Sequence, residues 1–292
     1  MPRNQKMWAL DVPGHDRVRH RSWRDHIMRL ACWQAEAQNE SVDGYVHRLA
    51  DAARRARGAG ADLLVTPELS LTGYRTHGPD VDHAAHLAAE AAGSAASIAA
   101  REGVAILYGC PERTAEGTYN TVRLVDARGE VVAVHRKSHL FGDAEAAVFD
   151  RGDGAVVQAR IAGVTVGLLI CYEVEFPELV RAHSLRGTQL LAVPGALARP
   201  WSIVTRTLVR ARAFESQLYV SYVNWSGVDG TVSYCGLTRV VTPHGRVQTA
   251  PEHSEALLVA DIDPAEIVAA RRRTPYLADR RPELYQDLVT ER

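Results

Sequence analysis

The sequence contains few cysteines, and none of them belongs to a C-x-x-C pair. Four occur in 292 residues, at Cys32, Cys110, Cys171 and Cys235. Scattered cysteines of this kind indicate neither a disulfide framework nor a zinc site. They are typical of a reduced compartment, and we therefore expect a cytoplasmic protein.

An excess of charge and a long apolar run are also missing. The chain has 34 basic and 35 acidic residues, interleaved along the sequence, for a formal net charge of −1. This balance gives no basic surface for nucleic acid. No window approaches the roughly 18 consecutive apolar residues of a membrane span, and the basic N-terminus lacks the apolar core of a signal peptide. We expect neither a nucleic-acid partner nor a membrane partner.

The chain does contain enough apolar residues to bury a substantial core, at 46% hydrophobic. Residues 1–27 show no sustained period and include a Pro-Gly break, whereas strand and helix patterns alternate from Met28 onward. The sequence therefore predicts an N-terminal extension over 1–27 and one α/β domain over 28–292. The extension is interpreted as an arm on the surface or on a partner subunit, and a native start at Met28 is the alternative.

Apolar spacing places the main elements of this domain. Val46, Leu49, Ala50 and Ala53 follow the i, i+3, i+4, i+7 rule of an amphipathic helix. Further patterns predict strands around residues 28–36, 104–112, 119–126, 189–195, 218–225, 234–241 and 256–262. Helices are predicted over 43–57, 83–101, 176–186 and 200–216, and a C-terminal tail from about residue 263.

Three apolar runs each end near a chemically reactive side chain. Glu68 follows DLLVTP, Lys137 ends EVVAVHRK, and Cys171 ends VTVGLLIC. Each run is typical of a buried parallel strand, and open α/β sheets place their chemistry at the carboxyl edge of such strands. A carboxylate, an ammonium and a thiol brought together can attack a carbonyl, stabilise the oxyanion and move one proton. The pattern predicts an acyl-transfer enzyme.

Cys171 carries the most information of the three. Its strand turns into a helix in which Pro177 suits the first turn and Gly187 the end. A nucleophile at a strand-to-helix turn is held rigidly beside backbone N–H groups, of which the Tyr172 amide is the natural oxyanion donor. The alternative is a small hydrophobic residue in the core, which is the usual role of a lone cysteine.

Glu68 and Lys137 fit complementary roles. Glu68 is a candidate general base that later protonates the leaving amine, and the alternative is a solvated loop acid. Strand alternation puts Val131, Ala133, His135 and Lys137 on one side, which predicts a half-buried ammonium for the oxyanion. The neighbouring basic residues favour a solvated strand end instead.

The motifs around these residues resemble those of the nitrilase (carbon–nitrogen hydrolase) superfamily, in the same order, from Met28 to the end of the chain. The segments that carry the resemblance are PELSLTGY, YGCPER, YNTVRLVDARGE, HRKSHLFGD, EAAVFDRGD, LLICYEVEFPE and VRARAFESQLYVSYVNWSG. Three ordered motifs with these flanks are far more specific than a single glutamate or cysteine.

This resemblance implies a four-layer α-β-β-α sandwich whose subunits pair through helices in a homodimer or larger homo-oligomer. It also implies a second catalytic acid at Glu145, which positions substrate within the proton network. No metal or organic cofactor is expected. The residues expected to bind substrate are Tyr74, Tyr172, Glu173, Glu175, Ala196 and Trp201.

The residues after Cys171 indicate the branch of the superfamily. Nitrilases typically carry Cys-Trp-Glu, whereas this chain has the amidase-like Cys-Tyr-Glu. N-carbamoyl amino acid hydrolases place an arginine shortly after the cysteine, whereas this chain has Glu173 and Glu175. It most resembles 5-aminopentanamidase and R-stereoselective aliphatic amidases, which implies a small amide substrate. The acids could receive its ω-ammonium group, or Glu175 could pair with Arg181 or Arg212.

One departure concerns the acyl pocket. Where those amidases tend to have VPTAN, this chain has VPGALARPW, so a larger or more apolar substrate is an alternative.

Three other functions are alternatives to amide hydrolysis, two of them with the same catalytic residues. A nitrilase would pass through a thioimidate, an amide-forming or cyclising enzyme would transfer the thioester to an amine, and a silent scaffold would need no chemistry.

Overall fold

The computed structural model describes residues 27–74, 78–154 and 156–288, and within them two six-stranded sheets form the centre of the fold. The first sheet has the order β15 (Ala256–Ile262), β1 (Met28–Gln34), β3 (Leu63–Val65), β4 (Ala105–Arg113), β5 (Thr118–Val125) and β6 (Val131–Arg136). The second has the order β14 (Val247–Thr249), β13 (Arg239–Val241), β10 (Tyr219–Val223), β9 (Leu190–Pro194), β8 (Val164–Leu168) and β7 (Val157–Ile161). A small third sheet joins β12 (Val232–Ser233), β11 (Ser226–Asp229) and β2 (Glu36–Ala37).

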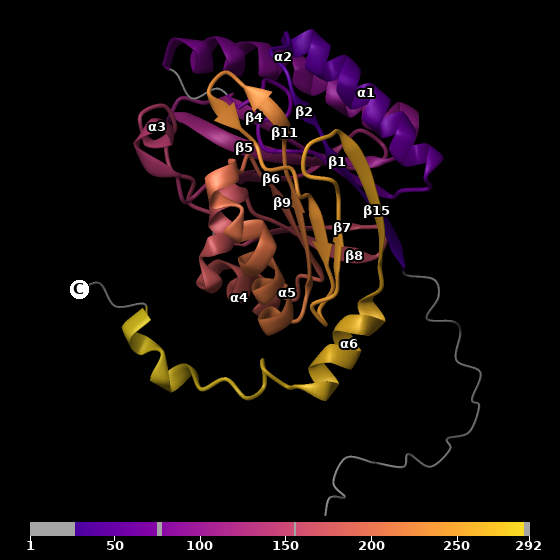
Figure 1. The fold of residues 1–292 in the computed structure, drawn as a ribbon, viewed down its shortest axis with the longest axis vertical. Helices are drawn as coiled ribbons and strands as arrows, with labels where there is room; N and C mark the ends of the chain where they lie inside the picture. Colours follow the sequence, from indigo (N-terminus) through magenta and orange to yellow (C-terminus); the bar gives the residue numbers. More distant parts are fainter. Residues whose placement is uncertain (1–26, 75–77, 155, 289–292) are drawn as a thin grey trace, which may run out of the picture.

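Helices cover the outer face of each large sheet (Figure 1). The first sheet is covered by α1 (Val42–Gly58) and α2 (Gly78–Glu102), and the second by α4 (Pro177–Leu185) and α5 (Val209–Ser216). The predicted four-layer α-β-β-α sandwich is confirmed. The remaining helices are α3 (Gly142–Ala146), α6 (Pro264–Arg273), 3₁₀ turns at Cys171–Glu175, Arg199–Trp201, Pro282–Leu284 and Gln286–Leu288, and a π-helical turn at Val204–Leu208.

Strand β1 shows why the central strands are almost continuously apolar. Leu30 and Cys32 belong to the core between the two sheets, whereas Ala31 and Trp33 belong to the core beneath α1 and α2. Successive side chains of a strand point to opposite faces, and both faces of this sheet are covered. Apolar residues are therefore favoured at the positions that face either core.

Strand β6 differs from its prediction. It is an edge strand that pairs antiparallel with β5, and Val131 is 49% exposed, so it is not a buried parallel strand. Because β5 is itself antiparallel to β4, β6 still runs in the same direction as β4 and β3. Its carboxyl end therefore meets the carboxyl end of β3, which places Lys137 near Glu68.

Two C-terminal segments also differ from expectation. The helix predicted over 200–216 is divided into a 3₁₀ turn, a π-helical turn and α5. The tail predicted from residue 263 begins with α6, because Ile267 and Ala270 on one face of this helix are buried. The extension predicted over 1–27 lies, apart from Ile27, outside the described residues. No helix in the described part of the chain has the length and hydrophobicity needed to cross a bilayer.

Candidate active site

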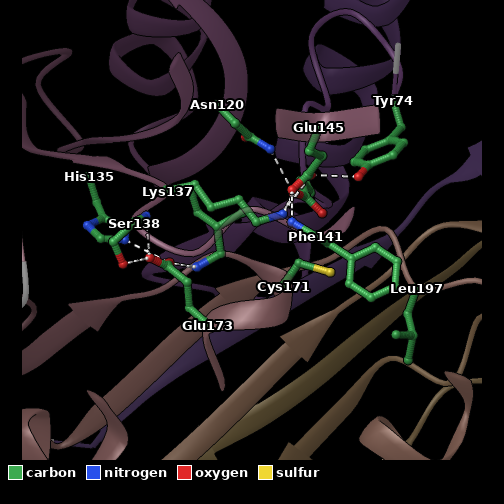
Figure 2. Close-up of polar contacts among 12 residues, drawn as sticks. Tyr74, Asn120, His135, Lys137, Ser138, Phe141, Glu145, Cys171, Glu173 and Leu197 are labelled. Atoms are coloured by element: carbon green, nitrogen blue, oxygen red, sulfur yellow. Dashed lines mark hydrogen bonds and ion pairs between the residues drawn. The ribbon is translucent and has the colours of Figure 1, made fainter. Parts of the chain in front are cut away.

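Lys137 lies between two carboxylates in the interior of the protein (Figure 2). Its Nζ donates to Glu68 Oε1 at 2.7 Å and to Glu145 Oε1 at 2.7 Å. The three side chains are at most 1% exposed. They come from the loop after β3, the end of β6 and helix α3, so the topology brings together residues that are up to 77 positions apart in the chain. A buried ammonium in contact with two acids is typical of a catalytic centre rather than of a surface ion pair.

The Glu68 carboxylate is oriented through only one of its oxygens. Asn120 Nδ2 donates to Oε1 at 2.8 Å, beside the bond from Lys137, and Trp225 Nε1 fixes the backbone by donating to the Glu68 carbonyl at 2.9 Å. Oε2 is buried and has no hydrogen-bond partner among the described residues. One oxygen is therefore anchored while the other remains available to accept a proton.

Glu145 is held from three sides. Tyr74 donates its hydroxyl to Oε1 at 2.6 Å, and the Phe141 amide donates to Oε2 at 2.6 Å. Together with the hydrogen bond from Lys137, these contacts connect the short helix α3 to Tyr74 and Lys137. Glu145 is thereby fixed where it can hold Lys137 and face a bound substrate.

Cys171 begins the 3₁₀ turn that follows β8, and its backbone is strained. Its φ is 45°, in the left-handed region that residues other than glycine rarely adopt. The side chain is 8% exposed, and its Sγ lies 3.3 Å from the Tyr222 hydroxyl. The predicted helix with Pro177 in its first turn is present as α4, but the 3₁₀ turn separates it from the cysteine.

The charges of the site shift its ionisation equilibria strongly. Burial raises the pKa of the Cys171 thiol, and the nearby Glu68 carboxylate raises it further. Burial also raises the pKa of Glu68, although Lys137 opposes this effect. For Lys137, burial alone would lower the pKa, but the surrounding Glu68, Cys171 and Glu145 raise it overall. The resting site therefore keeps a permanent ammonium, a neutral thiol and a carboxylate whose basicity is increased for proton transfer.

A cavity of about 300 Å³ opens onto Cys171. Phe141 contacts both Tyr172 and Trp201 edge to face, with ring centroids 5.3 and 5.6 Å apart. The lining residues are Tyr74, Phe141, Gly142, Asp143, Ala144, Glu145, Cys171, Tyr172, Glu175, Ala196, Leu197, Ala198, Trp201 and Val232. A volume at the lower end of the range for ligand pockets fits a small molecule.

Five of the six residues predicted to bind substrate line this cavity: Tyr74, Tyr172, Glu175, Ala196 and Trp201. Arg212 does not pair with the Glu175 carboxylate. Its guanidinium donates to the Glu175 carbonyl at 2.7 Å and pairs with Glu215 at 3.0 Å. Nor is an ion pair between Glu175 and Arg181 found among the described residues. The Glu175 carboxylate remains available to the cavity.

Glu173 does not line the cavity, in contrast to its prediction. It is fully buried, and its carboxylate accepts from the Ser138 amide at 2.7 Å and from the Ile170 amide at 2.6 Å. His135 Nε2 lies 2.8 Å from Glu173 Oε2, and the Ser138 hydroxyl donates to Glu173 Oε1. Figure 2 shows this group on the far side of Lys137 from Glu145. Glu173 thus links His135 and Ser138, on either side of Lys137, to Ile170, the residue before Cys171. This role is structural and does not involve contact with substrate.

Replacing Glu173 by glutamine should weaken both folding and turnover. Burial raises the pKa of Glu173, but His135 and the surrounding donors lower it overall, so the carboxylate is ionised. An amide group would turn an NH₂ toward the backbone donors, and we expect the free energy of unfolding to fall by roughly 3 kcal/mol. Urea unfolding and steady-state kinetics measure both effects, with the exposed Glu178→Gln as control. Unchanged stability of Glu173→Gln would contradict the role.

Several site residues were not found by sequence reasoning. Asn120 lies on β5 and Tyr222 on β10, while Phe141 precedes α3. The signal for Asn120 is a polar residue inside a buried strand, but the signals for the other two are ordinary aromatic residues. Among the described residues, no group of three or more His, Cys, Asp or Glu side chains is arranged to hold a metal ion.

Comparison with known proteins gives consistent matches over this same region. The model of the carbon–nitrogen hydrolase family matches residues 29–272. A hydrolase in the pqqF 5′ region of Pseudomonas protegens is 40% identical over 263 residues, covering 89% of this chain and 92% of that protein. An (R)-stereoselective amidase from Pseudomonas sp. is 35% identical over 222 residues, covering 75% and 80%.

Solved structures agree with these matches. An amidase from Nesterenkonia sp. superimposes with a TM-score of 0.82 at 34% identity, covering 91% of this chain and 97% of that one. A variant of the Nesterenkonia amidase shows covalent addition of the acetamide moiety of fluoroacetamide at its active-site cysteine.

Proposed function

Because the chain belongs to the carbon–nitrogen hydrolase family and is an amide-hydrolysing enzyme, we propose that it cleaves small primary amides that carry an ω-amino group. The products are a carboxylic acid and ammonia. The observation that carries the choice of substrate is the single half-buried carboxylate, Glu175, in the wall of the cavity at Cys171.

The charges of the cavity support a cationic or neutral substrate. Its lining includes the carboxylates of Asp143, Glu145 and Glu175, and no Lys, Arg or His is among the described residues that line it. A substrate carboxylate would have no counter-charge at the cavity wall and would lose its hydration. An ammonium group, in contrast, can pair with Glu175 while its methylene chain lies against the rings of Phe141 and Trp201.

The size of the cavity supports a short acyl chain. About 300 Å³ is enough for an amide of a few carbons, and the aromatic wall of Phe141, Tyr172 and Trp201 limits its width. Variants of the Nesterenkonia amidase form complexes with acrylamide and with butyramide. These ligands are also short primary amides.

Acylation begins with proton transfer from the Cys171 thiol to Glu68, whose Oε2 has no other partner among the described residues. The sulfur attacks the amide carbon, and the C=O electron pair moves to oxygen, where Lys137 Nζ and the Tyr172 amide stabilise the charge. Glu68 then gives its proton to the departing nitrogen, the C–N bond breaks, and ammonia leaves a thioester on Cys171.

Deacylation repeats the same steps with water. Glu68 removes a proton from water as the oxygen attacks the thioester carbon, and the second oxyanion forms at the same position. Collapse of this intermediate breaks the C–S bond, and Glu68 returns the proton to sulfur. Glu145 holds Lys137 in place throughout, since its Oε1 accepts from Nζ at 2.7 Å.

Incubation of the purified enzyme with a panel of primary amides, including 5-aminopentanamide, tests this proposal through released ammonia. Ammonia release that is fastest with ω-amino amides is the expected result. A matching nitrile and an added amine test the two alternative reactions that use the same site. Turnover of the nitrile alone, or formation of a new amide alone, would contradict amide hydrolysis as the function.

Glu175→Gln should change the selectivity among amide substrates while amide hydrolysis itself is retained. We expect kcat/KM for 5-aminopentanamide to fall about tenfold, or about 1.4 kcal/mol. Hexanamide, in which a methyl group replaces the ammonium, is the matched control and should change little. Glutaramate, with a carboxylate at the same end, should become a better substrate. Equal losses for 5-aminopentanamide and hexanamide would contradict an ion pair with Glu175.

The preference for the cationic amide should also depend on pH. Burial raises the pKa of Glu175, although Arg212 and Lys137 oppose this effect. Pairing requires the ionised carboxylate, so the ratio of kcat/KM for 5-aminopentanamide over hexanamide should fall as pH falls through this raised pKa. Effects common to the catalytic residues cancel in the ratio. The ratio should lose this dependence in Glu175→Gln, and a pH-independent ratio in the wild type would contradict the assignment.

A further inference from the structure

The interior of the site contains a tyrosine that has no role in the mechanism above. Tyr222 lies on β10 and is fully buried, and its hydroxyl is 3.3 Å from Cys171 Sγ. Strand β10 pairs with β9, so the Tyr222 ring lies beside the segment that follows β9. A phenol in direct contact with a nucleophile can change the reactivity of that nucleophile.

Gly195 creates the space for this ring. A Cβ added at Gly195 would lie 2.7 Å from both Cε1 and Cζ of Tyr222 and 2.8 Å from its hydroxyl oxygen. Carbon atoms that are not bonded do not approach so closely, and the interior has no free volume into which a rigid ring could shift without disturbing its neighbours. Any other residue at 195 would displace the ring, so this glycine determines where the hydroxyl lies.

The same short segment supplies a second polar group near the sulfur. Gly195 is followed by Ala196, whose backbone amide lowers the pKa of the Cys171 thiol. The backbone of Gly195 is itself fixed, because its amide donates to the Val223 carbonyl at 2.7 Å and its carbonyl accepts from the Glu68 amide at 3.3 Å. The sulfur is therefore faced by a fixed amide and by a hydroxyl, both positioned by one segment.

We propose that Tyr222 is a catalytic hydrogen-bond donor to the Cys171 sulfur, and that Gly195 is the residue that positions it. The proposal rests on Cys171 being the nucleophile. When Glu68 removes the thiol proton, the Tyr222 O–H donates to the thiolate and stabilises it. The charge leaves sulfur as the C–S bond forms, and it returns when that bond breaks in deacylation, so the same donor assists both steps.

The phenol is suited to donation because it keeps its own proton. Burial raises the pKa of Tyr222 well above its ordinary value, and the neighbouring Cys171 raises it further. The proton transferred in the reaction therefore goes to Glu68 and not to the phenolate. Hydrogen bonds to a charged group contribute more than neutral ones, and a thiolate is a charged acceptor.

The direct test is the pH dependence of Cys171 alkylation in Tyr222→Phe. Iodoacetamide labelling is followed by mass spectrometry, with Cys171→Ala as the blank for the other cysteines. We expect the midpoint of the rate profile to rise by about one to two pH units, because one hydrogen bond to the thiolate is lost. Amide turnover near neutral pH should fall by roughly tenfold to a hundredfold.

Tyr219→Phe is the matched control. Tyr219 is a buried tyrosine on the same strand, but its hydroxyl donates to Glu266 at 3.0 Å, away from the sulfur. Its alkylation profile should match that of the wild type. Each change removes only one oxygen atom, so both variants should fold. Thermal unfolding verifies this.

Gly195→Ala gives an independent second measurement. It keeps the Tyr222 hydroxyl but displaces the ring, so its alkylation midpoint should rise as in Tyr222→Phe. Combining the two substitutions should raise the midpoint no further than either one alone. Additive shifts would instead mean that Gly195 acts independently of Tyr222.

An alkylation midpoint in Tyr222→Phe within about 0.3 pH units of the wild type would overturn the proposal. A lower midpoint would also overturn it, because the hydroxyl would then be an acceptor from the thiol rather than a donor to the thiolate. The labelling reaction requires no amide substrate. Failure of the amide panel and failure of this proposal are therefore distinguishable.

Discussion

Replacing Cys171 by alanine is expected to reduce amide hydrolysis by roughly 10⁶-fold, the effect of removing the nucleophile from a covalent hydrolase. Lys137 and Glu68 remain in this variant, but no group can form the thioester. The fold should be retained, because alanine fits into the volume that the cysteine side chain occupies. The left-handed backbone at position 171 is equally strained with either side chain. Ammonia release and thermal unfolding measure the two properties separately.

Cys110→Ala is the control for this experiment. Cys110 is also buried, but it lies on β4 in the core beneath α2 and outside the cavity. The Cys110→Ala variant should be less stable than the wild type, but its turnover per folded molecule should be unchanged. Substantial hydrolysis by purified Cys171→Ala would rule out Cys171 as the nucleophile and with it the proposed mechanism.

Replacing Lys137 by methionine should damage both catalysis and stability. The side chain would keep its length but leave the Glu68 and Glu145 carboxylates buried without the ammonium that both contact at 2.7 Å. We expect kcat/KM to fall by about 10²–10³-fold through loss of the oxyanion donor alone. The free energy of unfolding should fall by about 3–5 kcal/mol, as when one partner of a buried ion pair is removed.

The stability deficit of Lys137→Met should depend on pH. Without the ammonium, Lys137 no longer opposes the effect of burial on Glu68, so the pKa of this carboxylate rises further above its value of about 4.3 in the unfolded chain. A group whose pKa is raised by folding favours the folded state below its unfolded pKa, and this contribution is lost as pH rises through the folded value. The deficit relative to wild type should therefore be smaller at pH 5 than at pH 8.

Urea unfolding at these two pH values measures this dependence. The control is Arg136→Met at the neighbouring position. Arg136 pairs with Glu112 and lies over the ring of Tyr119, so its loss leaves the Glu68 and Glu145 carboxylates paired with Lys137. An equal deficit for Lys137→Met at pH 5 and pH 8 would show that the buried carboxylates are not its cause.

The sequence was most informative where a reactive residue follows a buried strand. Glu68 and Cys171 follow the apolar runs that form β3 and β8. Each strand is parallel to a neighbour in its own sheet, and the packing of the two sheets brings the two ends together. For Lys137 the same reasoning placed the residue correctly but not its strand. Direction decides where the end of a strand lies, and β6 keeps that direction although it pairs antiparallel at the edge.

Glu173 and Glu175 show where sequence reasoning stopped. The two acids are separated by one residue, and the sequence predicts substrate binding for both. In a 3₁₀ turn each residue is rotated by about a third of a turn from the previous one, so side chains two positions apart point in different directions. The turn begins at Cys171, whose backbone is left-handed. Glu175 consequently reaches the cavity, whereas Glu173 is buried against Ser138 and Ile170.

The sequence by itself predicted an α/β domain and singled out Glu68, Lys137 and Cys171 as candidate reactive residues, and its resemblance to a known family implied the sandwich. Apolar periodicity and reactive side chains are local properties, and they can be read from neighbouring letters. Only the tertiary structure decided which oxygen of Glu68 has no partner among the described residues, which acid faces the cavity and that Tyr222 contacts the sulfur. These facts depend on distances between side chains of separate strands, and such distances are fixed by packing rather than by any short stretch of sequence.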